Sequence, residues 1–137
     1  MKKIGLVVIT LVLAMVMITG CGAKALSEDF NEEEVKKAAE NAVTTLDSGD
    51  YETFSNELVS EIMKKDLTAE VMKNAVDQVM PNRGAFVEFT SEATFGKTDK
   101  NEEDYAVVVV VAKYESQKVT YTVSLDKNLK IIGFYLK

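Results

Sequence analysis

The chain has 137 residues, with 16 basic and 22 acidic side chains, no histidine and a single cysteine, so its formal net charge is −6. Without histidine, the protein lacks the usual general base, the serine–histidine and cysteine–histidine nucleophile pairs, and the histidine ligands of zinc and iron sites. An acidic surface repels phosphate backbones and anionic lipid headgroups, so we expect neither nucleic-acid binding nor electrostatic docking on membranes.

The first twenty residues have the three regions of a secretory signal. Two lysines precede an uncharged run from Ile4 to Thr19, and Gly20 stands immediately before Cys21. This setting resembles the lipobox of bacterial lipoproteins, in which the thiol is thioether-linked to diacylglycerol and the peptide is cut just before it. We therefore predict a lipoprotein signal peptide over residues 1–20, cleavage between Gly20 and Cys21, and lipidation of Cys21.

Two other interpretations of this segment fit the sequence less well. Its 16 uncharged residues would span only about 24 Å as a helix, short of the ~30 Å hydrocarbon core, so a membrane-spanning helix fits poorly. An ordinary secreted protein cut near Gly20 would keep Cys21 as a free thiol. Because a lone cysteine in an oxidising compartment has no disulfide partner, an anchoring role explains it better. We expect a protein held by its lipid on the extracytoplasmic face of the cell membrane.

Removal of the signal leaves 117 residues, enough for one domain with a core and too few for two. We assign residues 21–28 to the lipidated N-terminus and a short spacer, and residues 29–137 to a single α+β domain. The signal takes two lysines with it, so 14 basic side chains face 22 acidic ones and the formal net charge becomes −8.

The first half of this domain has helical periodicity. Apolar residues recur at the spacing of one helical face from Asn31 to Leu46, and three glutamates stand in the first turn. A second, shorter helix is predicted from about Asp50 to Lys64. Its buried side would carry Phe54, Leu58, Ile62 and Met63. A third helix is predicted to begin at its N-cap, Thr68, and to end at Pro81.

The second half has the two-residue period of antiparallel strands. Strands are predicted over residues 85–97, 104–115, 118–126 and 130–136. Pairing Glu115 with Lys118 would give the two middle strands a shared apolar face, which must be the face covered by helices. That face would carry Val108, Val110, Ala112, Tyr114, Val119, Tyr121, Val123 and Leu125. The opposite face would carry Val107, Val109 and Val111 beside Thr120, Thr122 and Ser124.

Three helices followed by a curled four-stranded antiparallel meander predict an α+β fold with helices on one side of the sheet. Residues 38–43 and 46–54 resemble the "helix, small-Gly-Asp-Tyr, helix" opening of the nuclear-transport-factor-two-like (cystatin-like) superfamily, and residues 123–134 resemble its last hairpin. Within it, the chain resembles most the small lipoprotein domain called domain of unknown function 3887, over roughly residues 30–136. Leu129 stands where glycine is usual, so we expect a different turn there.

The resemblance implies a cone-shaped cavity between sheet and helices, where enzymes of the superfamily often set an Asp or Glu beside a Tyr. The predicted face turns Tyr114 and Tyr121 toward the helices, with Phe54 and Phe134 nearby. These four residues are candidates for the cavity lining, although buried tyrosines are more often core residues whose hydroxyl reaches a rim or a water. Because the carboxylates nearby lie in a turn or in a strand of unknown register, we assign no catalytic residue and no cofactor.

Two further features have alternative interpretations. The acidic turn over residues 99–104 lacks the glycine that sharpens a calcium loop, so we expect a solvated hairpin tip and no metal site. Five consecutive valines, residues 107–111, predict a strand with apolar neighbours on both faces. The outer stripe of Val107, Val109 and Val111 could pair with a second copy, a partner domain or the N-terminal tail, or be diluted by neighbouring polar side chains.

The leading functional hypothesis is a non-enzymatic binding or interaction module, held by its lipid outside a bacterial cytoplasmic membrane. Its ligand would be a small apolar or amphipathic molecule in the cone, a cell-wall component, a secreted peptide or another envelope protein. One alternative is a small enzyme of the isomerase or dehydratase kind that uses a buried carboxylate and a tyrosine. The other is a structural homodimer in which phenylalanine and valine side chains fill the cavity.

Overall fold

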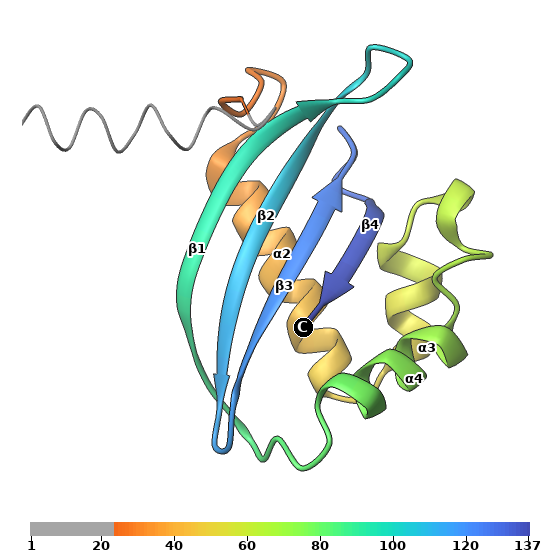
Figure 1. The fold of residues 1–137 in the computed structure, drawn as a ribbon. Coiled ribbons are helices and arrows are strands. Elements are labelled where there is room, and N and C mark those ends of the chain that lie inside the picture. Colours follow the sequence, from red (N-terminus) through yellow and green to blue (C-terminus); the bar gives the residue numbers. More distant parts are fainter. Residues whose placement is uncertain (1–23) are drawn as a thin grey trace, which may run out of the picture.

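A computed structural model describes residues 24–137, which form a layer of helical segments packed on one antiparallel sheet (Figure 1). The helical segments are α2 (Glu32–Asp47), α3 (Tyr51–Thr53), the π-helical turn η2 (Phe54–Leu58), the 3₁₀ turn η3 (Glu61–Met63) and α4 (Ala69–Val79). The strands are β1 (Phe86–Thr98), β2 (Asp104–Tyr114), β3 (Lys118–Leu125) and β4 (Ile131–Leu136), paired in chain order. The predicted α+β fold, with helices on an open four-stranded antiparallel sheet, is confirmed.

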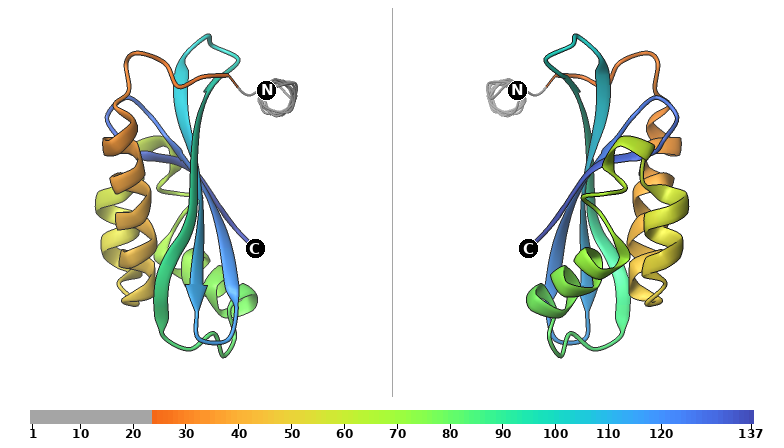
Figure 2. Two further views of the ribbon diagram at one scale, coloured as in Figure 1. Left: turned by 90° about the vertical axis from the view of Figure 1, so that its left-hand side faces the viewer. Right: turned by 90° about the vertical axis from the view of Figure 1, so that its right-hand side faces the viewer.

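Helix α2 forms where the apolar stripe predicts it and supplies much of the core. The Asn31 side chain accepts hydrogen bonds from the backbone N–H groups of Glu33 and Glu34, at 3.0 and 3.2 Å, which satisfies two of the free donors at the start of the helix. The apolar side of the helix is completely buried and comprises Val35, Ala39, Ala42, Val43 and Leu46. Figure 2 shows α2 lying along one side of the sheet.

The prediction of one continuous helix over residues 50–64 is wrong. The chain leaves the helical conformation at Val59, which forms a parallel bridge with Ile131. The next backbone N–H, that of Ser60, donates to the Ile131 carbonyl at 2.9 Å. Phe54, before the break, is fully buried as predicted. Ile62, after the break, was also predicted to be buried but is 73% exposed.

The β2–β3 hairpin is offset by two residues from the predicted register. Lys118 faces Lys113 and not Glu115. The backbone N–H groups of Glu115 and Ser116 donate to the carbonyls of Ala85 and Arg83, both at 3.0 Å, so the hairpin tip is tied to the loop before β1. Because a shift of two residues preserves the faces of both strands, all eight residues predicted for the covered face are buried.

The turn between β3 and β4 also differs from expectation. Leu129 itself has a φ of 60°, a left-handed conformation that costs a residue with a Cβ roughly 1–2 kcal/mol. The Asp126 carboxylate holds the turn by accepting hydrogen bonds from the backbone N–H groups of Asn128 and Lys130, both at 2.9 Å.

Residues 24–30, here called the N-terminal strap, join the sheet at the edge of β1. Lys24 exchanges two backbone hydrogen bonds with Gly96, of 3.1 and 2.8 Å, and its ammonium group lies 3.0 Å from the Asp104 carboxylate. A Cβ at position 96 would lie 2.6 Å from the Ala25 carbonyl oxygen, so the strap can cross the strand there only because residue 96 is glycine. The segment predicted as a spacer, residues 21–28, thus contacts the sheet from Lys24 onwards.

Candidate functional site

The four residues predicted to line a cavity do lie together, at the centre of the molecule. Phe54 packs edge-to-face on Phe134 with ring centroids 5.0 Å apart, and Phe134 lies 5.9 Å from the Tyr121 ring. The Tyr114 and Tyr121 hydroxyls are 2.5 Å apart. Phe54, Tyr114 and Tyr121 are each at most 1% exposed, and none of the four residues lines the surface pocket described below.

The structure adds a carboxylate to this cluster that the sequence reasoning missed. Asp47, the last residue of α2, accepts a hydrogen bond of 2.7 Å from the Tyr114 hydroxyl. The Arg83 guanidinium lies 3.7 Å from the same carboxylate oxygen and 5.3 Å from the centre of the Tyr114 ring. Asp47, Arg83, Tyr114 and Tyr121 are called the Asp–Tyr cluster from here on.

The direction of the hydrogen bonds in the Asp–Tyr cluster follows from its donors. Because an ionised carboxylate only accepts, Tyr114 must donate to Asp47, and Tyr121 must then donate to Tyr114. Burial raises the pKa of both tyrosines far above the ordinary range; the Tyr121 and Asp47 contacts raise that of Tyr114 further. Burial also raises the pKa of Asp47, against the lowering effects of Tyr114 and Arg83.

The cluster has the parts of an acid–base pair, but its two tyrosines are buried. The side chains of Asp47 and Arg83 are 15% and 21% exposed, whereas the two tyrosines have essentially no exposed surface. A tyrosine whose pKa is raised in this way stays protonated near neutral pH. The arrangement therefore satisfies the polar groups of two core tyrosines, which is a structural task.

One signal in the sequence could have identified Asp47. An acidic residue in the last turn of a helix is unfavourable because the carbonyl end of the helix carries a partial negative charge. The last turn of α2 holds Asp47 and no basic residue. Such a placement indicates a compensating partner elsewhere in the chain, and Arg83, the single arginine, is that partner.

A second carboxylate, Glu92 on β1, also faces the helices and was missed. Glu92 pairs with Val110 of the buried face, and its Oε1 atom is buried without a hydrogen-bond partner. Burial, together with the neighbouring Glu40 carboxyl, raises the pKa of Glu92 to about 7, while Lys36 acts in the opposite direction. The pairing of β1 with β2 is irregular between Phe86 and Glu88 and between Phe89 and Ser91. Each irregularity changes which alternate residues of β1 face the helices, so counting along the strand could not place Glu92.

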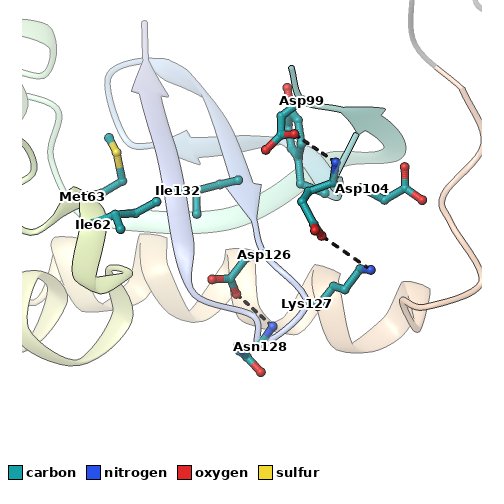
Figure 3. Close-up of a pocket in the computed structure, with 10 residues that line it drawn as sticks. Ile62, Met63, Asp99, Asp104, Asp126, Lys127, Asn128 and Ile132 are labelled. Carbon is teal, nitrogen blue, oxygen red and sulfur yellow. Dashed lines mark hydrogen bonds and ion pairs between the residues drawn. The ribbon is translucent and has the colours of Figure 1, made fainter. Parts of the chain in front are cut away.

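A surface pocket of about 510 Å³ lies beside the β1–β2 hairpin, at the end of β2 opposite to Tyr114 (Figure 3). It is formed by η3, the β1–β2 hairpin, the β3–β4 turn and the start of β4. Apolar side chains of Ile62, Met63 and Ile132 stand on one side, and the acidic groups stand on the other. The acidic and polar residues of the lining are Asp99, Glu103, Asp104, Tyr105, Asp126, Lys127 and Asn128.

The acids of this pocket are engaged in the protein's own turns and ion pairs. Asp99 accepts hydrogen bonds from the backbone N–H groups of Asn101 and Glu103, and Lys127 lies 3.9 Å from the Glu103 carboxylate. Within residues 24–137, no group of three acidic or cysteine side chains is arranged to hold a metal ion. The pocket thus has an apolar wall and an acidic rim, and the predicted solvated tip forms part of that rim.

The valine stripe lies on the face of the sheet opposite α2. Val107 is only 3% exposed, and Val109 and Val111 are half-buried. Their cross-strand neighbours on β3 are Ser124, Thr122 and Thr120. The exposed apolar area of the stripe is therefore smaller than five valines in a row suggest.

Cys21 and the predicted signal, residues 1–20, lie outside the described residues. Among residues 24–137, no helix is both long enough and apolar enough to cross a membrane.

Comparisons with known proteins agree with this fold. No curated protein matches the chain. The NMR structure of a protein from Ruminococcus gnavus is similar to it, with a TM-score of 0.72 and 27% sequence identity over 82% of this chain and 96% of that one. A family model described as "Protein of unknown function (DUF3887)" matches residues 39–134, which include α3, α4, the strands β1 to β3, most of β4 and all four residues of the Asp–Tyr cluster. The chain therefore belongs to the DUF3887 family.

Proposed function

We propose that this protein is a lipoprotein of the extracytoplasmic membrane face and that its domain is a non-enzymatic binding module. The observation that carries the proposal is the setting of Cys21, the single cysteine, behind a short uncharged segment that begins with lysines. The strap adds support, because Lys24 is bridged to Gly96 of the sheet and only Gly22 and Ala23 separate it from Cys21 in the sequence.

The fold supports membership of the nuclear-transport-factor-two-like superfamily as a further part of this proposal. Its helices come first, one face of a curved antiparallel meander is packed on them, and the aromatic side chains of the expected cone meet between the two layers. In this chain the cone is filled at its centre by Phe54, Tyr114 and Tyr121. The binding place of the proposed module is therefore the pocket of about 510 Å³ near Ile132, whose volume suits a small molecule.

Native mass spectrometry of the acylated protein, extracted in detergent from the cells that make it, tests the binding role. We expect an adduct of small-molecule mass that is lost when Ile132→Glu places a charge on the apolar wall. Val87→Glu is the matched control, because Val87 is 51% exposed on β1 and does not line the pocket. A bare protein mass for both wild type and control would remove the binding proposal, and a dimer mass would favour the structural homodimer instead.

The enzyme alternative rests on one specific observation, the 2.7 Å hydrogen bond between Asp47 and Tyr114. If the Asp–Tyr cluster is structural, Tyr114→Phe should lower the free energy of unfolding by about 1–3 kcal/mol, because the buried oxygens of Asp47 and Tyr121 lose a partner. Urea unfolding measures this loss, and Tyr135→Phe is the control because Tyr135 is 61% exposed. An unchanged stability for Tyr114→Phe would contradict the structural role and leave the enzyme alternative standing.

A further inference from the structure

One face of the sheet carries a charge opposite in sign to that of the whole protein. Pairing places four lysines and one glutamate on the face that points away from α2, here called the outer face, for a net charge of +3: Lys97, Lys113, Lys118, Lys137 and Glu88. The remaining charged residues of the mature chain are 10 basic and 21 acidic ones. The negative net charge of the molecule is therefore the sum of a basic outer face and a strongly acidic set of residues elsewhere.

The basic residues of the outer face are held in an unfavourable arrangement. Lys113 and Lys118 stand directly opposite each other on β2 and β3, and like charges in that position destabilise a sheet. Lys137 stands opposite Thr120, one pair further along the same end. Within residues 24–137, none of these three lysines makes an ion pair. Glu88 stands opposite Lys113 on β1, whereas no acidic residue is paired with Lys118 or Lys137 on the neighbouring strands.

The N-terminal strap begins on the same side of the sheet. The strap, which precedes α2, crosses the edge of the sheet from the helix side, so that its beginning lies on the side of the outer face (Figure 2). Lys24 is fixed to Gly96 by two backbone hydrogen bonds. Three Cα-to-Cα steps separate Lys24 from Cys21, and an extended chain of that length reaches at most about 11 Å. That reach is comparable to the Debye length of about 8–10 Å at physiological ionic strength.

The anchor near Gly96 and the lysines at the opposite end of the sheet would together hold the domain flat on the membrane. Gly96, at the tether, and Glu88, beside Lys113, are eight residues apart on β1, which corresponds to about 27 Å along an extended strand. A domain standing upright on its tether would hold the Lys113–Lys118–Lys137 end several Debye lengths from the lipid. A domain lying on its outer face would bring that end to the headgroups, with the acyl chains holding the end that carries the acidic tip, residues 99–104.

The uncharged part of the outer face suits a polar–apolar boundary. Tyr135 on β4 is 61% exposed and stands opposite Thr122, and Ala93 and Phe95 on β1 stand opposite the valine stripe. Tyrosines, with an apolar ring and a polar hydroxyl, are enriched at membrane–water boundaries.

We propose that the outer face docks on the anionic headgroups of the bilayer in which Cys21 is anchored. This inference rests on the proposed lipid anchor. It revises the expectation, drawn from net charge, that the domain is repelled by anionic lipid, because the acidic groups of the helices lie one layer further from the membrane. The acidic tip at residues 99–104 stays at the anchored end and lies away from the Lys113–Lys118–Lys137 end. Each lysine near an anionic surface strengthens association about fivefold, so the four lysines together favour the docked orientation.

Lysine footprinting of the acylated protein tests the proposal. The protein is placed in vesicles of phosphatidylcholine alone, or of phosphatidylcholine with phosphatidylglycerol, and treated with a water-soluble acetylating reagent. We expect acetylation of Lys113, Lys118 and Lys137 to be about fivefold slower or more on the anionic vesicles, and salt near 1 M to abolish the difference. Lys37 and Lys65, exposed on the helical side of the fold, are the internal controls and should react equally in both.

The same samples separate failure of the orientation from failure of the anchor. The mass of the N-terminal peptide reports acylation of Cys21 directly, and its absence would overturn the proposed anchor. If the protein is acylated and floats with the vesicles, equal acetylation of all five lysines in both lipids would overturn the docking proposal alone. Protection of the three outer-face lysines in neutral vesicles, together with a dimer mass, would assign the face to a second copy and would also overturn it.

Discussion

Replacing Phe54 by alanine is expected to lower the free energy of unfolding by about 3–5 kcal/mol. The Phe54 ring has no exposed surface and packs edge-to-face on Phe134. The backbone around it cannot collapse into the space left by the ring, because Val59 and Ser60 are hydrogen-bonded or bridged to Ile131 on the adjacent strand. Urea unfolding followed by far-ultraviolet circular dichroism measures the loss.

Phe86→Ala is the matched control for this prediction. Phe86 is also an aromatic residue of the sheet, but it is 41% exposed, so its replacement should cost about half as much or less. A loss for Phe54→Ala no larger than that for Phe86→Ala would contradict tight packing of Phe54 between the helices and the sheet.

Replacing Glu92 by glutamine is expected to stabilise the protein at pH 8. One Glu92 oxygen is buried without a partner, and burial and the Glu40 carboxyl raise the pKa of Glu92 from 4.5 to about 7. The native state therefore binds more protons than the unfolded chain between these two values, so stability falls as the pH rises through this window. Glutamine removes the charge, and the gain at pH 8 should be about 1–3 kcal/mol after discounting for partial exposure.

At pH 4 the same substitution should change stability little, because Glu92 is then protonated in the native state. Glu88→Gln is the control: Glu88 lies on the same strand, exposed on the outer face, and its replacement should stay within about 0.5 kcal/mol at both pH values. Urea midpoints at pH 4 and pH 8 give the comparison. A destabilised Glu92→Gln protein at pH 8 would show that the Glu92 carboxylate is stabilised as an ion, contrary to its orphaned oxygen.

Local patterns were sufficient for most of the elements. The stripe of α2 and the N-cap Thr68 of α4 are short-range signals, and the structure confirms both. The strands begin and end within one residue of their predicted bounds, because their two-residue period continues to the turns that flank them. Which face of β2 and β3 is covered followed from the same alternation, even though the register was off by two residues.

The failures share a physical cause, namely contacts between segments distant in sequence. The helix predicted over residues 50–64 is interrupted by the bridge from Val59 to Ile131, a partner 72 positions away that no local pattern contains. The hairpin register depends on hydrogen bonds from its tip to the loop at residues 83–85. The role of Asp47 in the Asp–Tyr cluster was missed for the same reason, since its partner Tyr114 lies 67 positions further along the chain.

The candidate sites divide in the same way. The setting of Cys21 is a contiguous motif and can be recognised in the sequence alone, whereas the pocket near Ile132 is assembled from η3, two turns and β4. The basic character of the outer face required the strand register, because Lys97, Lys113, Lys118 and Lys137 are scattered among acidic residues in the sequence and gather only when the strands pair.

Metabolic labelling with palmitate is the most direct test of the lipid anchor on which the proposed function depends. Wild-type protein should carry the label and the Cys21→Ser protein should carry none, because Cys21 is the only thiol in the chain. A wild-type protein that is produced normally but remains unlabelled, like the Cys21→Ser protein, would contradict the account.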